Sequence, residues 1–151
     1  MSVLADLFDP DSISLNVSAT SKAEAFRLAA DYFAKKLSIS NELVVRFLND
    51  REALGSTALG AGVAIPHGRI KGLKQSCAAF FRLPQGIEFQ APDQLPVSIL
   101  IFLLVPEKAT QDHLEILSTI AQLLSDTTAR ETLQQELDPN KVSQFIRGWS
   151  P

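Results

Sequence analysis

The feature that most constrains the fold is an apolar run over residues 97–105, which Pro96 and Pro106 bracket. The run, Val-Ser-Ile-Leu-Ile-Phe-Leu-Leu-Val, is apolar at nearly every position and rich in β-branched and aromatic residues. A strand with one face in water would alternate apolar and polar residues, and a membrane helix would need about 20 apolar residues. The run therefore predicts a central β-strand covered on both faces, with helices on both sides of a sheet.

Capping patterns predict two helices in the first third of the chain. Ser21 and Glu24 form a capping box, in which the serine accepts from a first-turn N–H and the glutamate from the serine's own N–H. Ser40 can cap a second helix, which carries Arg51 near its end. A strand over residues 13–17 precedes both helices, because apolar and polar residues alternate there. The predicted apolar faces are Phe26, Ala29, Ala30, Phe33 and Leu37 in the first helix, and Leu43, Val44, Phe47 and Leu48 in the second.

Two strands are predicted between these helices and the central strand. Residues 63–65 predict a short buried strand that Pro66 stops, since proline has no N–H to donate to a ladder. Residues 76–83 predict another strand, followed by a turn at 84–86. Residues 86–89 fit a short strand and a bend equally well.

Three more helices are predicted after the central strand. Thr110, Asp126 and Asp138 are their expected N-caps, and Pro139 suits the first position of the last helix. His113 falls in the first turn of the first of these helices, on its inward face. The predicted inward faces are His113, Leu117, Ile120, Ala121 and Leu124, then Ala129, Leu133 and Leu137, and finally Val142, Phe145 and Ile146.

Composition and charge exclude several classes of function. The 151 residues carry a net charge of −3 and a sequence pI of about 5.3, so we expect no nucleic-acid partner. The N-terminus has acids where a signal peptide needs bases, and we expect a cytoplasmic protein with no membrane insertion. Cys77 is the only cysteine, which excludes an intrachain disulfide. Without repeats, linkers or a metal or cofactor motif, residues 1–151 predict a single domain that needs no cofactor.

The stretch that most clearly indicates chemistry is 51–69, a glycine-rich loop near whose end His67 lies. We expect His67 at the end of the strand that Pro66 stops, with Gly68 leaving open space behind it. No acid occurs between Glu52 and Glu88, so this neighbourhood should favour a bound anion. The basic residues inside this interval are Arg69, Lys71, Lys74 and Arg82.

Three residues are therefore candidates for one site: His67, His113 and Arg51. A neutral imidazole, with an unperturbed pKa of ~6.5, can attack a phosphoryl donor and become a phosphohistidine. Such a transfer needs cations and hydrogen-bond donors around the phosphoryl oxygens. Arg51 can supply a guanidinium fork, while His113 and the hydroxyl of Ser56 or Thr57 can supply neutral donors.

Each of these residues also has an ordinary structural interpretation. A histidine on an apolar helix face, such as His113, is often a core residue, His67 can be a turn residue, and Arg51 suits the end of any helix. The glycines at 60–62 lack the rest of a Walker loop or a dinucleotide fingerprint, and no third zinc ligand is favoured by spacing. The residue pattern alone indicates an α/β domain with an anion site.

These residues resemble the signature of the fructose/mannitol-type enzyme IIA domains of the bacterial phosphoenolpyruvate phosphotransferase system. The likeness rests on Arg51-Glu52, Gly55-Ser56-Thr57, Gly60 and Gly62-Val-Ala-Ile-Pro-His67-Gly68. A second block, Leu103-Leu104-Val105-Pro106 followed by His113-Leu114 and Leu117, is similar to the family's second histidine region. The likeness covers about residues 4–149.

The resemblance implies that His67 accepts a phosphoryl group on Nε2 from a phosphorylated HPr-like carrier protein. It implies that His113 helps to hold this group, that Arg51 lies near it, and that the fold is a mixed sheet sandwiched between helices. The Gly-Ser-Thr form and the free-standing chain resemble the nitrogen-regulatory (Ntr) branch, whose phosphorylation state regulates partner proteins. Two alternatives stay open: a sugar-specific enzyme IIA that passes phosphate to a IIB domain, and a binding module that carries no phosphate.

Overall fold

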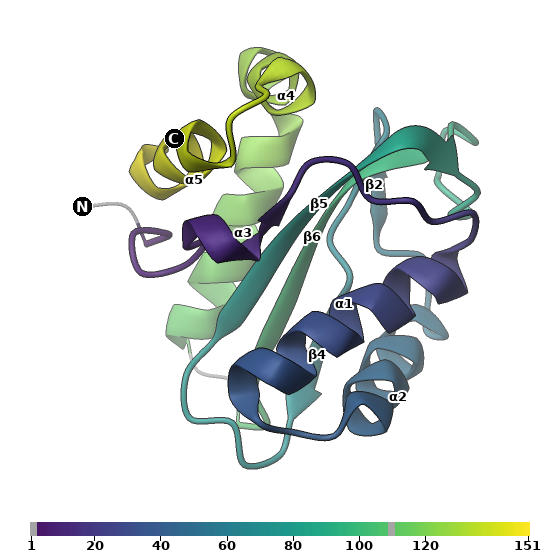
Figure 1. Cartoon of the computed structure of the whole chain (residues 1–151), viewed down its shortest axis with the longest axis vertical. Helices are drawn as coiled ribbons and strands as arrows, with labels where there is room; N and C mark the ends of the chain where they lie inside the picture. The colour runs from purple at the N-terminus through teal and green to yellow at the C-terminus, as the bar shows by residue number, and fades with distance from the viewer. Residues whose placement is uncertain (1–2, 109–110) are drawn as a thin grey trace.

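The computed structural model describes residues 3–108 and 111–151. Across these residues a six-stranded sheet lies between two layers of helices, so the predicted α/β fold is confirmed (Figure 1). The strand order is β1-β5-β6-β3-β2, with β4 also beside β6. The sheet is mixed, because β6 is antiparallel to β5 and parallel to β3 and β4. The strands are β1 (Ile13–Ser14), β2 (Ala58–Gly60), β3 (Val63–Ala64), β4 (His67–Ile70), β5 (Cys77–Ile87) and β6 (Val97–Pro106).

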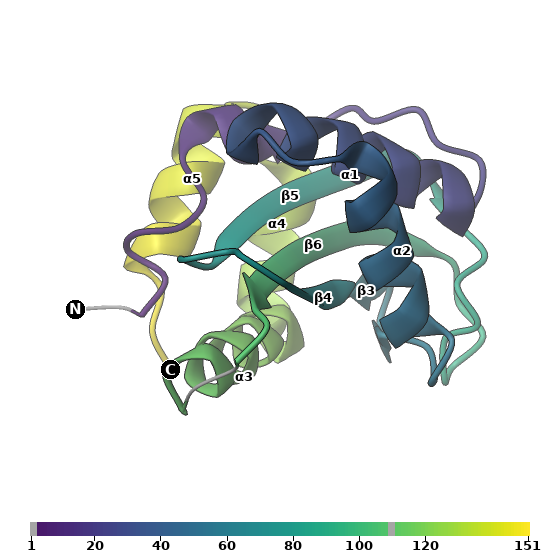
Figure 2. The same cartoon turned by 90° about the horizontal axis from the view of Figure 1, so that it is seen from below.

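The helices divide between the two faces of the sheet. On one face lie α1 (Lys22–Leu37) and α2 (Asn41–Glu52) (Figure 2). On the other lie α3 (Gln111–Ser125), α4 (Thr127–Gln135) and α5 (Pro139–Gly148). A short 3₁₀-helix, η1 (Pro10–Ser12), precedes β1.

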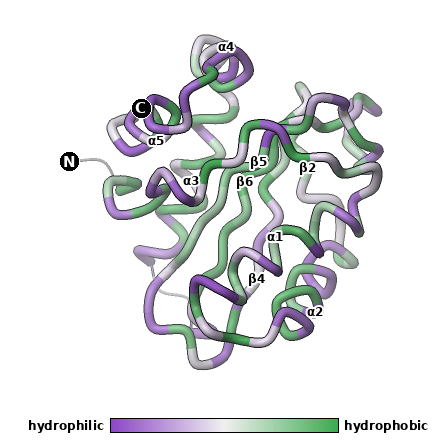
Figure 3. The backbone as a smooth tube through the Cα atoms, in the orientation of Figure 1, coloured by the Kyte–Doolittle hydropathy of each residue, from purple (hydrophilic) through white to green (hydrophobic). Residues whose placement is uncertain are grey.

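The central strand β6 is the element that the apolar run predicted. Its even-numbered residues from 100 to 104 are buried under α1 and α2, and its odd-numbered residues from 99 to 105 are buried under the other three helices. Figure 3 shows the hydrophobic residues of β6 between the two helix layers. Burial on both faces is therefore confirmed, and it explains why this strand does not alternate apolar with polar residues.

Local capping chemistry sets the starts of four helices. The predicted N-caps whose side chains accept a hydrogen bond from a first-turn N–H are Ser21, Ser40, Asp126 and Asp138. The capping box differs from the prediction in one bond, because Glu24 accepts from the N–H of Thr20 and not from that of Ser21. The N-cap predicted at Thr110 lies outside the described residues.

The turn predicted at 84–86 is wrong, because β5 continues through it to Ile87. The pairing of β5 with β6 is irregular between Arg82 and Ile87, as in a β-bulge. No residue in that interval pairs with β6, so the missing N–H of Pro84 breaks no ladder bond. A Cβ on Gly86 would lie 2.8 Å from the Cβ of Pro96, so close contact with the chain entering β6 requires a glycine here.

Two further expectations need correction. The strand predicted over 13–17 is confined to Ile13–Ser14, although the N–H of Val17 still donates to the carbonyl of Arg82. Leu137 was expected on an inward helix face, but α4 ends at Gln135 and the Leu137 side chain is 83% exposed.

None of the helices within residues 3–108 and 111–151 is both long enough and apolar enough to span a membrane.

Candidate active site

His67 follows the short strand β3, as the sequence predicted, but it also begins a further strand, β4. β3 and β4 both pair in parallel with β6 and keep the same register, so they form one strand that is interrupted at Ile65 and Pro66. Pro66 has no N–H for the ladder, although its carbonyl still accepts from the N–H of Leu103 at 3.0 Å. Within the described residues β4 pairs with β6 alone, which leaves His67 on an edge of the sheet.

Alternation along β4 sends successive side chains to opposite layers. His67 pairs with Leu103, whose side chain faces the layer of α3, while Gly68 and Ile70 face α1 and α2. The open space predicted behind Gly68 is absent: a Cβ there would lie 3.2 Å from the carbonyl carbon and oxygen of Phe47. Gly68 therefore lets the backbone of α2 pack closely on β4.

This packing builds an open pocket of about 430 Å³ at the edge of the sheet. Figure 2 shows β4 between α2 and α3, the two helices that flank the pocket. Arg51 comes from the last turn of α2, His67 from the start of β4, and His113 from the first turn of α3. The structure thus brings together the three candidate site residues. The apolar part of the lining is Phe47, Leu54, Leu103, Val105, Leu114 and Leu117.

The ring of His67 is held by a backbone carbonyl. Its Nδ1 lies 2.8 Å from the carbonyl oxygen of Ile65. Because a carbonyl can only accept, Nδ1 carries the proton in this bond, and the neutral ring keeps its lone pair on Nε2. Burial lowers the pKa of His67, although the Ile65 carbonyl opposes that shift. The ring is therefore neutral and nucleophilic at Nε2 near neutral pH.

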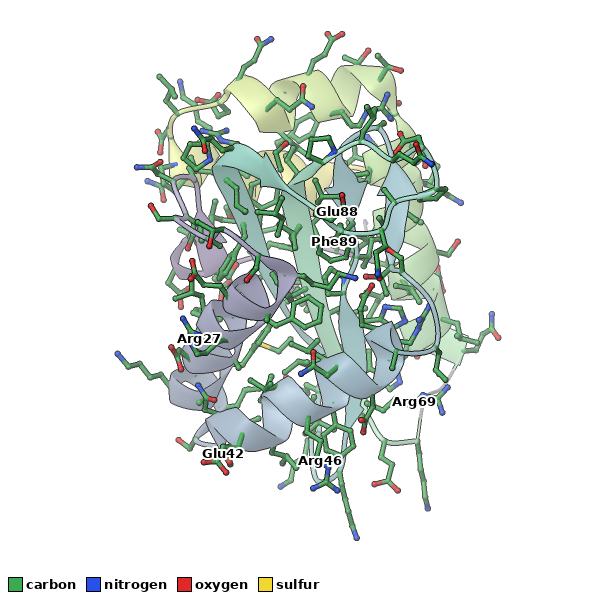
Figure 4. All side chains as sticks on the ribbon, turned by 90° about the vertical axis from the view of Figure 1, so that its right-hand side faces the viewer. Arg27, Glu42, Arg46, Arg69, Glu88 and Phe89 are labelled. Carbon is green, nitrogen blue, oxygen red and sulfur yellow. The ribbon has the colours of Figure 1, made fainter. Side chains whose placement is uncertain are left out.

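Two guanidinium groups lie in the pocket lining. Arg51 donates from Nη1 to the carbonyl oxygen of Gly55 at 2.9 Å, at the end of its own helix. Arg69 is exposed on β4 and is labelled in Figure 4. Both positive charges lower the pKa of His67. An anion bound at His67 would meet these two cations.

The pocket is less free of acids than the sequence indicated. Asp50 lines it, and the charge of Glu52 acts on His67 in the direction that raises the pKa. No acid lies between Glu52 and Glu88 in the sequence, but the end of α2 brings its own acids, Asp50 and Glu52, close to His67. The adjacency of Glu52 to Arg51 was the only sequence signal for this arrangement.

Ser56 and Thr57 do not line the pocket, and their hydroxyls have other partners. The Ser56 hydroxyl donates to the carbonyl of Phe89 at 2.7 Å, and that of Thr57 donates to the Glu52 carboxylate at 2.6 Å. These bonds anchor the loop between α2 and β2. The prediction that either hydroxyl faces the bound anion does not agree with this geometry.

The arrangement suits transfer of a phosphoryl group. It combines a neutral imidazole whose Nε2 keeps a lone pair, two arginines for the phosphoryl oxygens, and a lining that is otherwise largely apolar. In the part of the chain that the structure describes, there is no group of three or more His, Cys, Asp or Glu side chains placed to hold a metal ion.

Comparisons with known proteins point in the same direction. The family model described as "Phosphoenolpyruvate-dependent sugar phosphotransferase system, EIIA 2" matches residues 6–148. A nitrogen regulatory protein of Bradyrhizobium diazoefficiens is 36% identical over 143 residues, which are 95% of this chain and 94% of the relative. One of Pseudomonas aeruginosa is 36% identical over 144 residues, with the same coverage of 95% and 94%. The crystal structure of nitrogen regulatory protein IIA-Ntr from Neisseria meningitidis aligns with a TM-score of 0.92 at 40% identity, covering 96% of this chain and 99% of that one.

Proposed function

Because the chain belongs to the type 2 enzyme IIA family of the phosphoenolpyruvate-dependent phosphotransferase system, in its nitrogen-regulatory branch, we propose that it carries a phosphoryl group on His67. The donor is a phosphorylated HPr-like carrier protein. The observation that carries this proposal is the bond between Nδ1 of His67 and the Ile65 carbonyl, since it leaves Nε2 as the nucleophile.

The step needs no further reactant. The lone pair on Nε2 of His67 attacks the phosphorus, the bond from phosphorus to the donor breaks, and the donor's leaving atom takes that electron pair. The proton on Nδ1 stays where it is and continues to donate to Ile65. Return of the phosphoryl group to an acceptor is the same step in reverse.

Three neighbouring side chains would stabilise the negative charge of the phosphoryl group during transfer. Arg51 lies in the pocket and can exchange its bond to the Gly55 carbonyl for one to a phosphoryl oxygen. Arg69 adds positive charge from the same strand as His67. His113 lies across the pocket on α3 and is a donor for the oxygens once His67 carries the group.

Phosphorylation would also change what the pocket can bind. A phosphoryl group adds about two negative charges to a lining that is otherwise mainly apolar. A partner protein in the cytoplasm could therefore distinguish the two states of this chain, which is how we propose that it regulates its targets. This regulatory role needs no small-molecule acceptor.

Labelling tests the proposal directly. Incubation with phosphoenolpyruvate, enzyme I and the HPr-like carrier should label the chain with an acid-labile, alkali-stable phosphoryl group. His67→Ala should abolish the label; a label that survives this change refutes the assignment of His67. Transfer from the labelled chain to a purified IIB domain would instead identify a sugar-specific enzyme IIA.

His113 needs its own variant, because a histidine on a helix can be purely structural. His113→Ala should slow labelling while thermal unfolding stays close to that of the wild type. A loss of stability with labelling intact would make His113 a packing residue.

A further inference from the structure

We propose that Glu52 is a positioning residue for phosphoryl transfer, holding His67 in its reactive tautomer through Thr57 and Ile65. The inference rests on the proposed function, which assigns no role to Glu52. It follows from a continuous series of hydrogen bonds that begins at a buried carboxylate behind the pocket and ends at Nδ1 of His67.

The Glu52 carboxylate is nearly inaccessible to water, with 7% of its side chain exposed. It accepts three hydrogen bonds: from the N–H of Thr57 at 2.9 Å, from the Thr57 hydroxyl at 2.6 Å, and from the Lys22 ammonium at 3.1 Å. Burying the Glu52 carboxylate is costly unless such partners replace the water that it loses. Its position is therefore set by Thr57 and Lys22.

The bonds to Thr57 continue toward the active site. With its N–H and hydroxyl both on Glu52, the backbone of Thr57 is fixed, and its carbonyl accepts from the N–H of Ile65 at 3.1 Å. The carbonyl of the same Ile65 accepts from Nδ1 of His67 at 2.8 Å. Both polar backbone groups of Ile65 are thus engaged, one toward Glu52 and one toward the nucleophile.

At the Glu52 end, the series of hydrogen bonds contacts α1 and the segment before β6. Lys22 lies over the ring of Phe89, 4.4 Å from its centroid, in addition to its ion pair with Glu52. The carbonyl of Phe89 accepts from the Ser56 hydroxyl, which in turn accepts from the N–H of Ala58. Ser56 and Thr57 therefore connect Glu52 to the scaffold, although neither lines the pocket.

This arrangement bears on which ring nitrogen of His67 can react. If the Ile65 carbonyl moves, Nδ1 loses its acceptor and the proton can shift to Nε2, which removes the nucleophilic lone pair. The charge of Glu52 also acts on His67, together with those of Arg51 and Arg69, while Asp50 and His113 lie in the same pocket. A variant that removes the carboxylate changes both geometry and charge, so a second variant must separate them.

Glu52→Gln and Thr57→Val make that separation. The glutamine removes the charge and keeps the side-chain shape, while the valine removes only the hydroxyl and leaves the Glu52 charge in place. Nitrogen-15 NMR of the imidazole ring, at a pH well above the histidine pKa, measures the two tautomers directly. We expect both variants to gain the form protonated on Nε2 and to be labelled more slowly by about two- to tenfold, the range that one neutral hydrogen bond controls. The KM for the phosphorylated carrier should not change.

Asp11→Asn is the matched control, because Asp11 also pairs with a lysine of α1, Lys36, at 3.1 Å. Asp11 lies in η1 and does not line the pocket, so this variant should keep the wild-type tautomer and labelling rate. If Glu52→Gln does not fold, Thr57→Val alone decides the point. Wild-type tautomer populations and labelling rates in the folded variants would overturn the positioning role. Failure of the wild type itself to be labelled would refute the phosphocarrier function instead, and the tautomer comparison would still test Glu52.

Discussion

The close approach of α2 to β4 at Gly68 yields the sharpest prediction for the site. Replacing Gly68 with alanine puts a Cβ 3.2 Å from the carbonyl carbon and oxygen of Phe47 and 3.3 Å from its Cβ. Carbon atoms in contact prefer about 3.5–4.0 Å, so α2 must recede by a few tenths of an ångström. Because Arg51 is one turn beyond Phe47 on the same helix, it must recede as well.

Two opposing effects determine how Gly68→Ala changes the free energy of unfolding. Overpacking of this kind destabilises the folded state by about 1–3 kcal/mol. Alanine also reduces the conformational freedom of the unfolded chain, which stabilises the folded state by about 0.4–1 kcal/mol. We therefore expect Gly68→Ala to lower the free energy of unfolding by roughly 1–2 kcal/mol. Since the backbone of Gly68 is not in a left-handed conformation, the destabilising part of the effect comes from contact with α2.

Urea unfolding and the rate of labelling by the phosphorylated carrier measure the two consequences. Gly148→Ala is the matched control, because a Cβ there meets nothing within 4 Å and Gly148 ends α5 far along the chain. That variant should be as stable as the wild type or more stable, by up to about 1 kcal/mol. Equal stability and equal labelling of Gly68→Ala and the wild type would refute the close-packing argument. Reduced stability with unchanged labelling would show that the approach of α2 serves packing and does not place Arg51.

Two further predictions concern the protonation of His67 and the end of α4. Burial lowers the pKa of His67, so an NMR titration of the folded protein should give a midpoint below about 6.5. Because the unfolded chain then binds a proton on His67 more tightly than the folded chain does, the free energy of unfolding should decrease as the pH falls below about 6.5. A midpoint at or above that value would contradict the burial argument. Leu137→Ser should change the free energy of unfolding by less than about 0.5 kcal/mol, because its side chain is exposed. Leu133→Ala, one turn earlier and fully buried, should cost about 2–5 kcal/mol in the same unfolding assay.

Local patterns predicted much of the fold because local chemistry decides those elements. The N-caps at Ser21 and Asp126 accept the bonds that their side chains indicate, and β6 is buried on both faces as its unbroken apolar run requires. The errors occur where distant segments decide. β5 passes through a Pro-Gln-Gly sequence that normally turns, and Pro96 lies so close to Gly86 that no side chain would fit there.

In the site, too, local patterns predicted some features, while others depend on distant segments. Arg51, His67 and His113 line one pocket; α2 and α3, which carry Arg51 and His113, were predicted, but β4, which begins at His67, was not. The partners of Ser56 and Glu52 could not be predicted, because each depends on how loops and helices fold back. Proximity of a hydroxyl to a signature histidine in sequence does not determine which way the hydroxyl points.

The interruption at Pro66 explains why a nucleophile can be built on a strand at all. In an unbroken strand, a backbone carbonyl accepts from a neighbouring strand and a side chain simply faces one layer. At the break, the Ile65 carbonyl accepts from the imidazole of His67 instead, and the strand resumes pairing with β6 at once. The ring is thereby held by the residue two positions before it, while β6 pairs with His67 and the carbonyl of Thr57 holds the N–H of Ile65. Since the interruption lies on an edge of the sheet, α2 and α3 reach it from opposite faces with Arg51 and His113. The break at Pro66 orients the His67 ring, and the edge position of β4 leaves it open to the ends of α2 and α3.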